Sequence, residues 1–298
     1  MAPDREALAE MPDDTPSSPS PVTAPGPGVL SAVWCATGYE RYIREARISA
    51  ASVRRTNPGI ERMLFTDLPM DADVSDFDVV VRLENPQHNF ADKINVIRRV
   101  DRDRFVFLDG DTYTIGNIAS IWAVLERFDI AAAHDISRSQ LDLPRLPDCF
   151  PELNTGVIGF NRRRAGSRYD HESFCEAWLK RFEAMTAEHG RLETQDQPAF
   201  RELVFASEAR LAVLPPEYNC MFDVGLSVVG EVAILHGRSN QLRYVARKIN
   251  RGRMHPAWGR LRSRWFKGEG RGYGWLRRNA RVALRRIQTR PGPIEMRE

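Results

Sequence analysis

The sequence contains no apolar stretch long enough to cross a membrane and no segment typical of secretion. No run approaches the roughly 18 consecutive apolar residues of a transmembrane helix, and the first 28 residues combine acidic side chains with the lack of an apolar core segment. Cysteine is also scarce: Cys35, Cys149, Cys175 and Cys220 lie far apart and match no zinc or redox spacing. We therefore expect a cytoplasmic protein with reduced thiols.

Large apolar side chains are scarce in residues 1–28, which hold 7 of the chain's 19 prolines. A segment of this composition buries too little surface to offset the entropy of ordering it. We interpret residues 1–28 as a disordered leader.

Acidic residues are scarce at the other end of the chain. Residues 238–298 carry 18 Lys and Arg against 3 acidic residues, a net charge of +15, whereas residues 1–237 carry a net charge of −12. From Trp275 to Arg290 apolar residues recur at helical spacing, and arginines cover the other faces. Such a basic amphipathic helix, with tryptophans across residues 258–290, is typical of a segment that contacts an anionic membrane. A helix packed on the acidic body and, least favoured, a nucleic-acid-binding arm are the alternatives.

Strands and helices alternate through the rest of the chain. Predicted strands, from apolar runs of strand length, cover residues 29–37, 62–66, 77–83, 104–108, 128–133, 156–161, 211–214 and 232–236. Predicted helices, from apolar residues at spacings of three and four, cover residues 39–55, 93–100, 118–127 and 173–187. The pattern predicts one α/β domain over residues 29–240, with a mixed, mainly parallel sheet flanked by helices, and a basic, partly helical tail over residues 241–298.

An acidic pair follows the predicted strand 104–108. Asp109 and Asp111 flank Gly110 at the carboxyl end of that strand, the edge at which open parallel sheets bind ligands. The glycine permits close approach of the backbone. Two neighbouring carboxylates repel unless a cation lies between them, and Mg²⁺ or Mn²⁺ that carries a diphosphate suits this pair. An Asp-x-Asp sequence also occurs in solvated turns, which is the alternative.

Four sequence blocks, in this order and spacing, resemble the GT-A nucleotide-diphospho-sugar transferases. The blocks are FVFLDGDTY, ELNTGVIGFNRR, TQDQPAF and ILHG. Their pattern is most similar to the retaining group that includes glycogenin and bacterial lipopolysaccharide galactosyltransferases. The resemblance covers residues 29–240 and implies a GT-A (Rossmann-like) fold. It also implies a nucleotide-sugar donor, with UDP as the expected carrier, and a saccharide or lipid-linked acceptor, as in polysaccharide biosynthesis.

The resemblance implies that Asp109, Asp111 and His236 bind a divalent metal, Mn²⁺ or Mg²⁺, and that the two aspartates also contact the ribose and diphosphate of the donor. A histidine at a strand end is otherwise more often a hydrogen-bonded residue with no metal. Lys93 falls where the family has a basic residue that touches the diphosphate or the sugar. A solvated lysine at a helix start is the alternative.

After the first strand, Ala36, Thr37 and Tyr39 resemble the family's nucleobase pocket, with the Tyr39 ring stacked on uracil. Alternatively, Tyr39 is the first core residue of its helix. Near the other end of the domain, Gly237 and Arg238 match the His-Gly block that contacts the donor. The retaining group continues that block with Lys, Pro and Trp, whereas this chain reads HGRSNQLRY. Phosphate contacts are therefore expected from Arg238, Arg243 or Lys248, or are weaker than in the family, and the stereochemistry stays open.

Asp135 and Asn154 match positions that touch the hydroxyl groups of the donor sugar, although Asn-Thr-Gly also favours a turn. Asp196 and Gln197 match the catalytic Asp-Gln pair near the anomeric carbon. Alternatively, this pair caps a helix with Pro198 as its first residue.

Two other functions compete with sugar transfer. A nucleotidyltransferase that makes an activated sugar typically carries a glycine-rich, basic loop after its first strand, and the sequence CATGYERY lacks the repeated glycines. A non-catalytic module that binds membrane or nucleic acid would not need Asp109, Asp111 and His236 together. Both are therefore less favoured.

Overall fold

The computed structural model of the chain describes residues 28–68, 73–135, 143, 146–189, 195–222, 228, 230–238 and 242–251. The predicted leader before Gly28 and the predicted amphipathic helix at 275–290 lie outside these residues. Within the described part, no helix has the length and apolar character that crossing a membrane requires.

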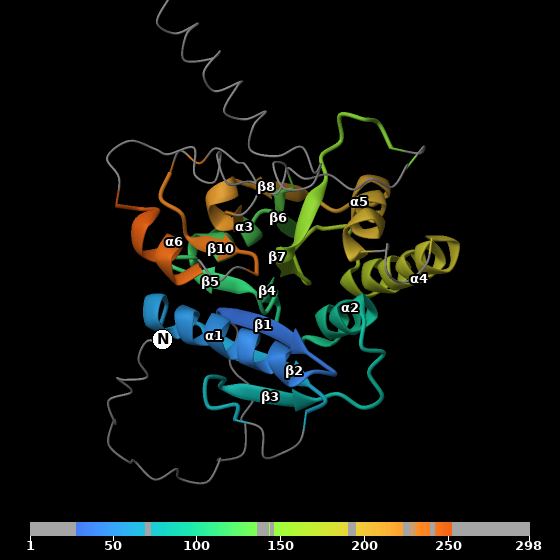
Figure 1. The fold of residues 1–298 in the computed structure, drawn as a ribbon. Helices are drawn as coiled ribbons and strands as arrows, with labels where there is room; N and C mark the ends of the chain where they lie inside the picture. Colours follow the sequence, from blue (N-terminus) through green and yellow to red (C-terminus); the bar gives the residue numbers. More distant parts are fainter. Residues whose placement is uncertain are drawn as a thin grey trace, which may run out of the picture.

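Seven strands form the central sheet, in the order β3-β2-β1-β4-β7-β6-β8 (Figure 1). The strands are β1 (Ser31–Ala36), β2 (Glu61–Thr66), β3 (Val79–Arg82), β4 (Arg104–Leu108), β6 (Ile130–His134), β7 (Leu153–Asn161) and β8 (Leu211–Leu214). β7 runs antiparallel to β4 and β6, and the other neighbouring strands of this sheet pair in parallel. The prediction of an α/β fold with a mixed, mainly parallel sheet is confirmed.

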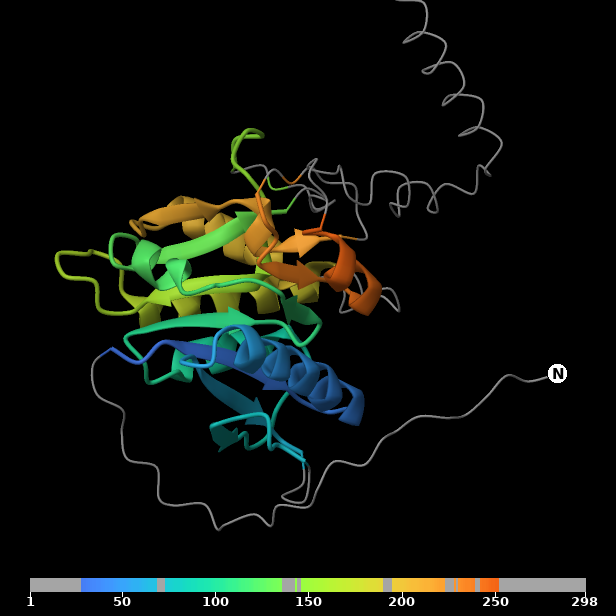
Figure 2. The same cartoon turned by 90° about the vertical axis from the view of Figure 1, so that its left-hand side faces the viewer.

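Helices cover both faces of this sheet (Figures 1 and 2). The helices of the described residues are α1 (Glu40–Thr56), α2 (Phe90–Arg99), α3 (Ser120–Leu125), α4 (His171–His189), α5 (Asp196–Ala206) and α6 (Leu242–Lys248), with a 3₁₀ turn at Pro216–Tyr218. α2, α4 and α5 pack on one face and α1 and α3 on the other. Along β4, Phe105 and Phe107 enter the first cluster, and Val106 and Leu108 enter the second. A strand buried on both faces explains the continuous apolar run of β4.

A second, three-stranded sheet lies beside the first, in the order β5-β10-β9. Its strands are β5 (Thr112–Thr114), β9 (Cys220–Met221) and β10 (Ile234–His236). β10 pairs antiparallel with β5, so that His236 lies opposite Thr112. This pairing brings a residue near the end of the described chain next to the acidic pair that follows β4.

Helix α6 lies in residues that the sequence analysis assigned to the basic tail. Its residue Val245 is buried, together with the following Ile249, against Leu235 of β10 and Cys220 of β9. This part of the basic segment therefore packs on the body.

Two of the alternatives considered for polar segments are wrong. Asn154 does not lie in a turn, because β7 begins at Leu153 and runs through it. Asp196 is not a helix cap, because it is the first residue of α5, the cap position is Gln195, and no side chain caps the helix. Pro198 is consequently the third residue of α5 and not the first.

Candidate metal centre

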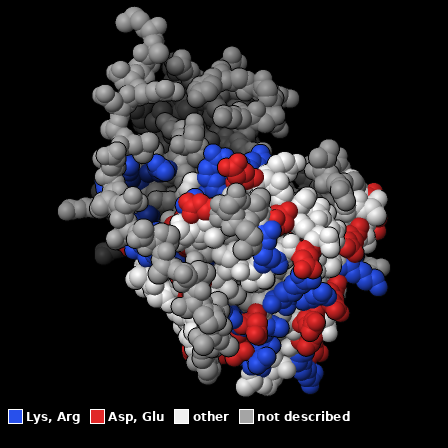
Figure 3. Space-filling model, turned by 90° about the horizontal axis from the view of Figure 1, so that it is seen from below, with Lys and Arg blue, Asp and Glu red and all other residues white. Residues whose placement is uncertain are grey.

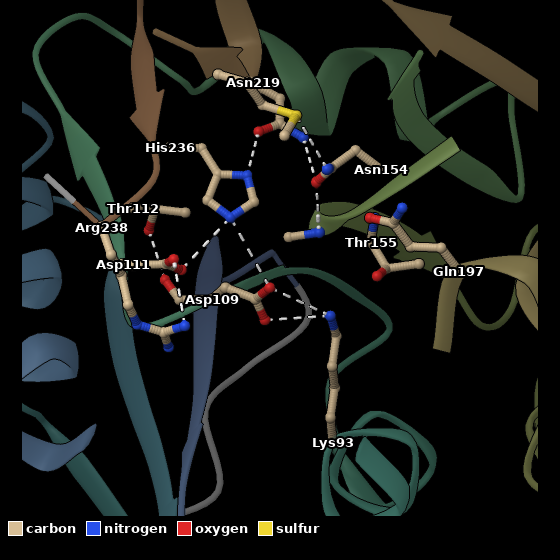
Figure 4. A network of polar contacts seen from close by, with 12 residues as sticks. Lys93, Asp109, Asp111, Thr112, Asn154, Thr155, Gln197, Asn219, His236 and Arg238 are labelled. Atoms are coloured by element: carbon tan, nitrogen blue, oxygen red, sulfur yellow. Dashed lines mark hydrogen bonds and ion pairs between the residues drawn. The ribbon is translucent and has the colours of Figure 1, made fainter. Parts of the chain in front are cut away.

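Three potential metal ligands converge at the carboxyl edge of the central sheet (Figure 4). Asp109 follows β4, Asp111 precedes β5, and His236 ends β10. One ligand atom from each side chain lies within 4.8 Å of the others. Nε2 of His236 is 3.4 Å from Oδ1 of Asp111 and 4.0 Å from Oδ2 of Asp109. The sequence prediction that these side chains face one point agrees with this geometry.

The backbone around the acidic pair is held by its neighbours. The amide of Asp109 donates to the carbonyl of Gly156 at 2.8 Å, and the hydroxyl of Thr112 donates to the carbonyl of Asp109 at 2.8 Å. A Cβ atom at Gly110 would lie 3.3 Å from the backbone nitrogen of Ala46 in α1. A glycine at position 110 therefore lets the turn pack tightly against α1.

A chain of side-chain amides sets the orientation of His236. Nδ2 of Asn154 donates to Oδ2 of Asp135 at 2.9 Å, and Nδ2 of Asn219 donates to Oδ1 of Asn154 at 2.8 Å. Nδ1 of His236 then donates to Oδ1 of Asn219 at 2.9 Å. Because an ionised carboxylate can only accept, Asp135 determines which way each amide faces. In the neutral imidazole this leaves the lone pair on Nε2, directed at Asp109 and Asp111.

The imidazole ring lies against the backbone of β7. A Cβ atom at Gly156 would lie 2.2 Å from Cε1 of His236, a distance that no side chain tolerates. Glycine at this position is therefore required for the observed placement of His236.

The electrostatics of the three side chains indicate a site for a cation. Burial opposes a charge on His236, but its contact with Asp111 and the charges of Asp111 and Asp109 outweigh it and raise its pKa. Burial also disfavours charge on Asp111, yet the hydrogen bond and charge of His236 lower its pKa to about 2. The pKa of Asp109 is raised, first by burial and then by the charge of Asp111, against the opposing effect of Lys93. A proton on His236 thus supplies positive charge at the point where a divalent cation would supply it. Two carboxylates and an imidazole nitrogen fit Mn²⁺ or Mg²⁺.

Lys93 is buried beside this centre. Its side chain is 5% exposed, and its Nζ lies 3.1 Å from Oδ1 of Asp109 and 3.2 Å from Oδ2 of Asp196. Burial disfavours the ammonium, but the two carboxylates outweigh this effect and raise its pKa. The alternative of a solvated lysine is wrong, and Lys93 links α2 to both β4 and α5.

Two of the residues expected near the donor sugar, Asn154 and Gln197, lie beside the metal ligands (Figure 4), and Asp135 joins them into one network. Nε2 of Gln197 donates to Oδ2 of Asp135 at 3.0 Å, and the backbone amide of Thr155 donates to Oε1 of Gln197 at 3.3 Å. Since Asp135 also accepts from Asn154, the network extends from α5 through β6 and β7 to His236.

The residues expected at the nucleobase lie at the carboxyl end of β1, next to β4 in the sheet. Ala36 is buried, and the hydroxyl of Thr37 donates to Oδ2 of Asp92 at 2.9 Å. Tyr39 is 61% exposed at the N-cap position of α1, so the alternative that it is a core residue is wrong. Its ring meets that of Tyr42 edge to face, with 5.8 Å between centroids.

Gly237 and Arg238 extend the centre past β10. The amide of Gly237 donates to the backbone carbonyl of Asp111 at 3.1 Å, with a φ of +136° that favours glycine. Nη1 of Arg238 lies 3.9 Å from Oδ2 of Asp111, and its Nε lies 3.1 Å from Oε2 of Glu45.

Sequence reasoning missed Asn219 and the packing role of Gly156. Asn219 lies between a 3₁₀ turn and the two-residue strand β9, where no periodicity or motif singles it out. Gly156 was predicted as the start of a strand or as part of a turn, and not as a contact of His236. Their contribution depends on contacts with β10, which is far away in sequence.

No protein-family model and no curated protein sequence matches the chain. Solved structures do match. The galactosyltransferase LgtC, in complex with donor and acceptor sugar analogs, matches with a TM-score of 0.52 and 14% identity over 84% of this chain and 99% of LgtC. The glycosyltransferase GlyE from Streptococcus pneumoniae TIGR4 matches with a TM-score of 0.53 and 17% identity over 85% of this chain and 63% of GlyE.

An active-site mutant of LgtC, in which glutamate replaces a glutamine, matches with a TM-score of 0.52 and 14% identity over 83% of this chain. The chain therefore spans nearly all of LgtC but less than two thirds of GlyE. At these sequence identities the structural similarity is evidence for the fold alone. It is separate from the evidence of the four sequence blocks. The chain adopts the GT-A fold that those blocks predict.

Proposed function

We propose that this chain is a metal-dependent glycosyltransferase that moves a sugar from a nucleoside-diphosphate sugar, with UDP as the carrier, to a saccharide or lipid-linked acceptor. The observation that carries the proposal is the convergence of Asp109, Asp111 and His236, with Nε2 of the imidazole directed at the two carboxylates. They lie at the edge where open α/β sheets bind ligands. The fold shared with a galactosyltransferase and a glycosyltransferase supports this class of reaction.

The departing group would be a nucleoside diphosphate, and positive charge around it is what the chain must provide. A divalent cation held by Asp109, Asp111 and His236 would act as a Lewis acid on the charge that develops there. Lys93 adds a second charge, and its direction is set by ion pairs with Asp109 and Asp196. Arg238, whose side chain is 58% exposed beside Asp111, is placed to contact phosphate oxygens.

The donor sugar would lie along the network of Asp135, Asn154 and Gln197, with Gln197 nearest the anomeric carbon. LgtC also has a glutamine in its active site. Asp196 is 2% exposed and paired with Lys93, so we assign it a role through that lysine. The sugar passes through an oxocarbenium-like state. Retention of configuration is the proposed outcome, with the departing phosphate accepting the proton of the acceptor hydroxyl.

The nucleobase would bind at the end of β1. Tyr39 offers an exposed ring on which uracil can stack, and the buried residues Ala36 and Thr37 would form the wall of the pocket. Thr37 is fixed by Asp92, which also accepts from the backbone amides of Gln87 and His88 at 2.7 and 2.8 Å. The end of β1 and the loop before α2 are thereby tied together.

The acceptor would be met at the cytoplasmic face of a membrane, where residues 258–290 make peripheral contact with anionic lipid. This segment lies outside the described residues, and the proposal rests on its sequence. Deletion of residues 271–298 should strongly weaken binding to anionic liposomes and leave hydrolysis of the donor in solution intact.

A panel of nucleotide sugars tests the proposed reaction. The purified chain is incubated with Mn²⁺ and each donor in turn, and release of nucleotide and thermal shift are measured. We expect hydrolysis of at least one UDP-sugar, which stops when EDTA removes the metal. The absence of both hydrolysis and thermal shift with every donor would contradict the proposal.

A further inference from the structure

A groove lies between α1, β5 and α6 and is formed by side chains other than those of the candidate metal centre. These three elements lie side by side in Figure 1. It encloses about 560 Å³. Its apolar lining includes Ile48 and Ala51 of α1 and Ile115 after β5. Its charged lining consists of Arg55, at the end of α1, and Arg243 and Arg247 of α6. The three arginines are exposed.

The charge in this groove is of one sign. Among the described residues, none that lines the groove is acidic, and no carboxylate lies within ion-pair distance of its three arginines. Two other arginines of α1 are paired: Arg47 and Arg54 lie 3.0 and 3.1 Å from the carboxylate of Asp76. On the face seen in Figure 3, acidic and basic side chains likewise lie next to one another. The groove is therefore complementary to an anion.

The groove is also built to hold a phosphate beside apolar groups. Arg55 donates to the hydroxyl of Tyr113 at 3.1 Å and stacks over its ring at 5.3 Å, which orients the planar guanidinium. Ile48 of the groove is 39% exposed, and Tyr244, which follows Arg243 in α6 but does not line the groove, is 56% exposed. Tyrosine beside arginine is typical of side chains that lie at the boundary between lipid headgroups and acyl chains.

The position of α6 in the chain points to the same partner. The described residues end at Arg251, shortly after α6. Residues 252–298 carry 13 Lys and Arg against 3 acidic residues. The groove therefore adjoins the point from which the most basic part of the chain continues.

We propose that this groove binds the phosphate headgroup of an anionic phospholipid in a membrane leaflet. Arg55, Arg243 and Arg247 contact the phosphate, and Ile48 and Ile115 contact the glycerol and the first acyl carbons. Lipid binding at this groove does not depend on the proposed sugar transfer. The functional consequence of this lipid binding does depend on the proposed sugar transfer. Tyr113 lies two residues after Asp111, so a bound leaflet would lie close to the proposed donor site.

The first test compares two double variants of the full chain that lose the same charge. Arg55→Gln/Arg247→Gln removes two groove arginines, and Arg163→Gln/Arg168→Gln removes two arginines that are 71% and 82% exposed outside the groove. Binding is measured by co-sedimentation with phosphatidylcholine vesicles that contain or lack phosphatidylglycerol. Since each arginine near an anionic surface contributes roughly fivefold, we expect roughly a 30-fold loss of affinity for the groove variant and less than about twofold for the control. Equal losses in both variants would overturn the proposal.

The second test locates the contact. Amide hydrogen exchange of the full chain should slow in α6, β5 and the end of α1 when phosphatidylglycerol vesicles are added. Protection confined to residues 252–298 would overturn the groove as the site. Protection of residues 1–27 without vesicles, lost in Arg55→Gln/Arg247→Gln, would show instead that the acidic leader occupies it. Mn²⁺-dependent UDP binding of the same variant should be unchanged, which separates failure of this proposal from failure of the proposed function.

Discussion

Nδ1 of His236 donates to Oδ1 of Asn219 at 2.9 Å, and the opposite ring nitrogen faces Asp111 at 3.4 Å. Asn219 thus determines which nitrogen carries the proton, a role that residues behind metal ligands often have. We expect Asn219→Ala to weaken Mn²⁺ binding by about 10- to 100-fold, because the imidazole loses its fixed tautomer and orientation. Isothermal titration of the purified variant with Mn²⁺ and UDP measures this effect.

A matched control for that variant is Asn161→Ala. Asn161 is 7% exposed against 4% for Asn219, and its amide donates to the carbonyl of Leu125 near the other end of β7. Both variants remove a buried amide, but Asn161 should affect stability alone. If the two variants lose metal affinity equally, Asn219 acts only through the stability of the fold.

A substitution at Gly156 provides a second test of the placement of His236. We expect Gly156→Ala to displace His236 and to abolish Mn²⁺-dependent nucleotide binding, because the new Cβ would lie 2.2 Å from Cε1 of the ring. Gly159→Ala, in the same strand, would meet the flexible side chain of Leu125 at 3.0 Å and should retain the metal response. Circular dichroism checks that both variants fold. A Gly156→Ala protein that binds Mn²⁺ normally would show that His236 is no ligand.

The raised pKa of His236 predicts how metal binding depends on pH. Contact with Asp111 and the charges of both aspartates raise this pKa despite burial, so the proton stabilises the metal-free fold at low pH. That contribution is lost as pH rises through the raised pKa. Mn²⁺ requires the unprotonated Nε2, and its affinity should therefore weaken as pH falls through the same window. The rise in Tm caused by Mn²⁺ should grow with pH in the wild type and vary less in His236→Asn. A pH-independent rise in the wild type would count against His236 as a ligand.

A substitution of Gln197 distinguishes a catalytic role of this side chain from a role in donor binding. Both ends of its amide are held, by Asp135 at 3.0 Å and by the backbone amide of Thr155 at 3.3 Å, so its position is defined before any donor binds. We expect Gln197→Ala to lower kcat more than it changes the KM for the donor, because its proposed place is at the reacting carbon. Steady-state kinetics with the donor identified in the panel decide this, and an effect on KM alone would make Gln197 a binding residue.

His171 predicts a loss of stability in acid that has no link to the metal. It is 3% exposed, and its nitrogens contact the carbonyl of Ile97 at 3.1 Å and the hydroxyl of Tyr169 at 2.9 Å. Burial lowers its pKa from 6.5 to about 4. The unfolded chain therefore takes up this proton before the folded chain does, and the free energy of unfolding should fall by on the order of 3 kcal/mol across that window. Urea unfolding of the wild type and of His171→Gln at several pH values tests this; identical pH dependence in both would contradict it.

Apolar periodicity was sufficient to predict most of the central sheet. β4 begins at Arg104 and ends at Leu108 as predicted, because it buries a continuous run of side chains. α1 begins one residue after the start of the predicted helix, because its buried side chains are regularly spaced. β7 was predicted to start at Gly156 but starts at Leu153. Two of the three missing residues, Asn154 and Thr155, are polar, and they make contacts with Asn219, Gln197 and Asp135 that no local pattern reveals.

The candidate site was predictable where a motif follows a strand. The acidic pair after β4 and the histidine at the end of β10 are marked by apolar runs that end at the sheet edge. The burial of Lys93 was not predictable in this way, because it depends on two carboxylates that are distant in sequence, Asp109 after β4 and Asp196 in α5. The packing of α6 was also missed, because its basic composition resembles a solvated tail and conceals Val245 and Ile249.

Titration of UDP into the wild type and into Asp111→Asn, each with Mn²⁺ and with EDTA, tests the central claim most directly. Asp103→Asn, which changes an acidic side chain that is 55% exposed, is the matched control. The account predicts that wild type and control bind UDP tightly with Mn²⁺ and weakly with EDTA, whereas Asp111→Asn binds weakly in both although its fold is intact. UDP affinity that is unchanged in Asp111→Asn, or that is equal with Mn²⁺ and with EDTA in the wild type, would contradict a metal bridge between this site and the nucleotide.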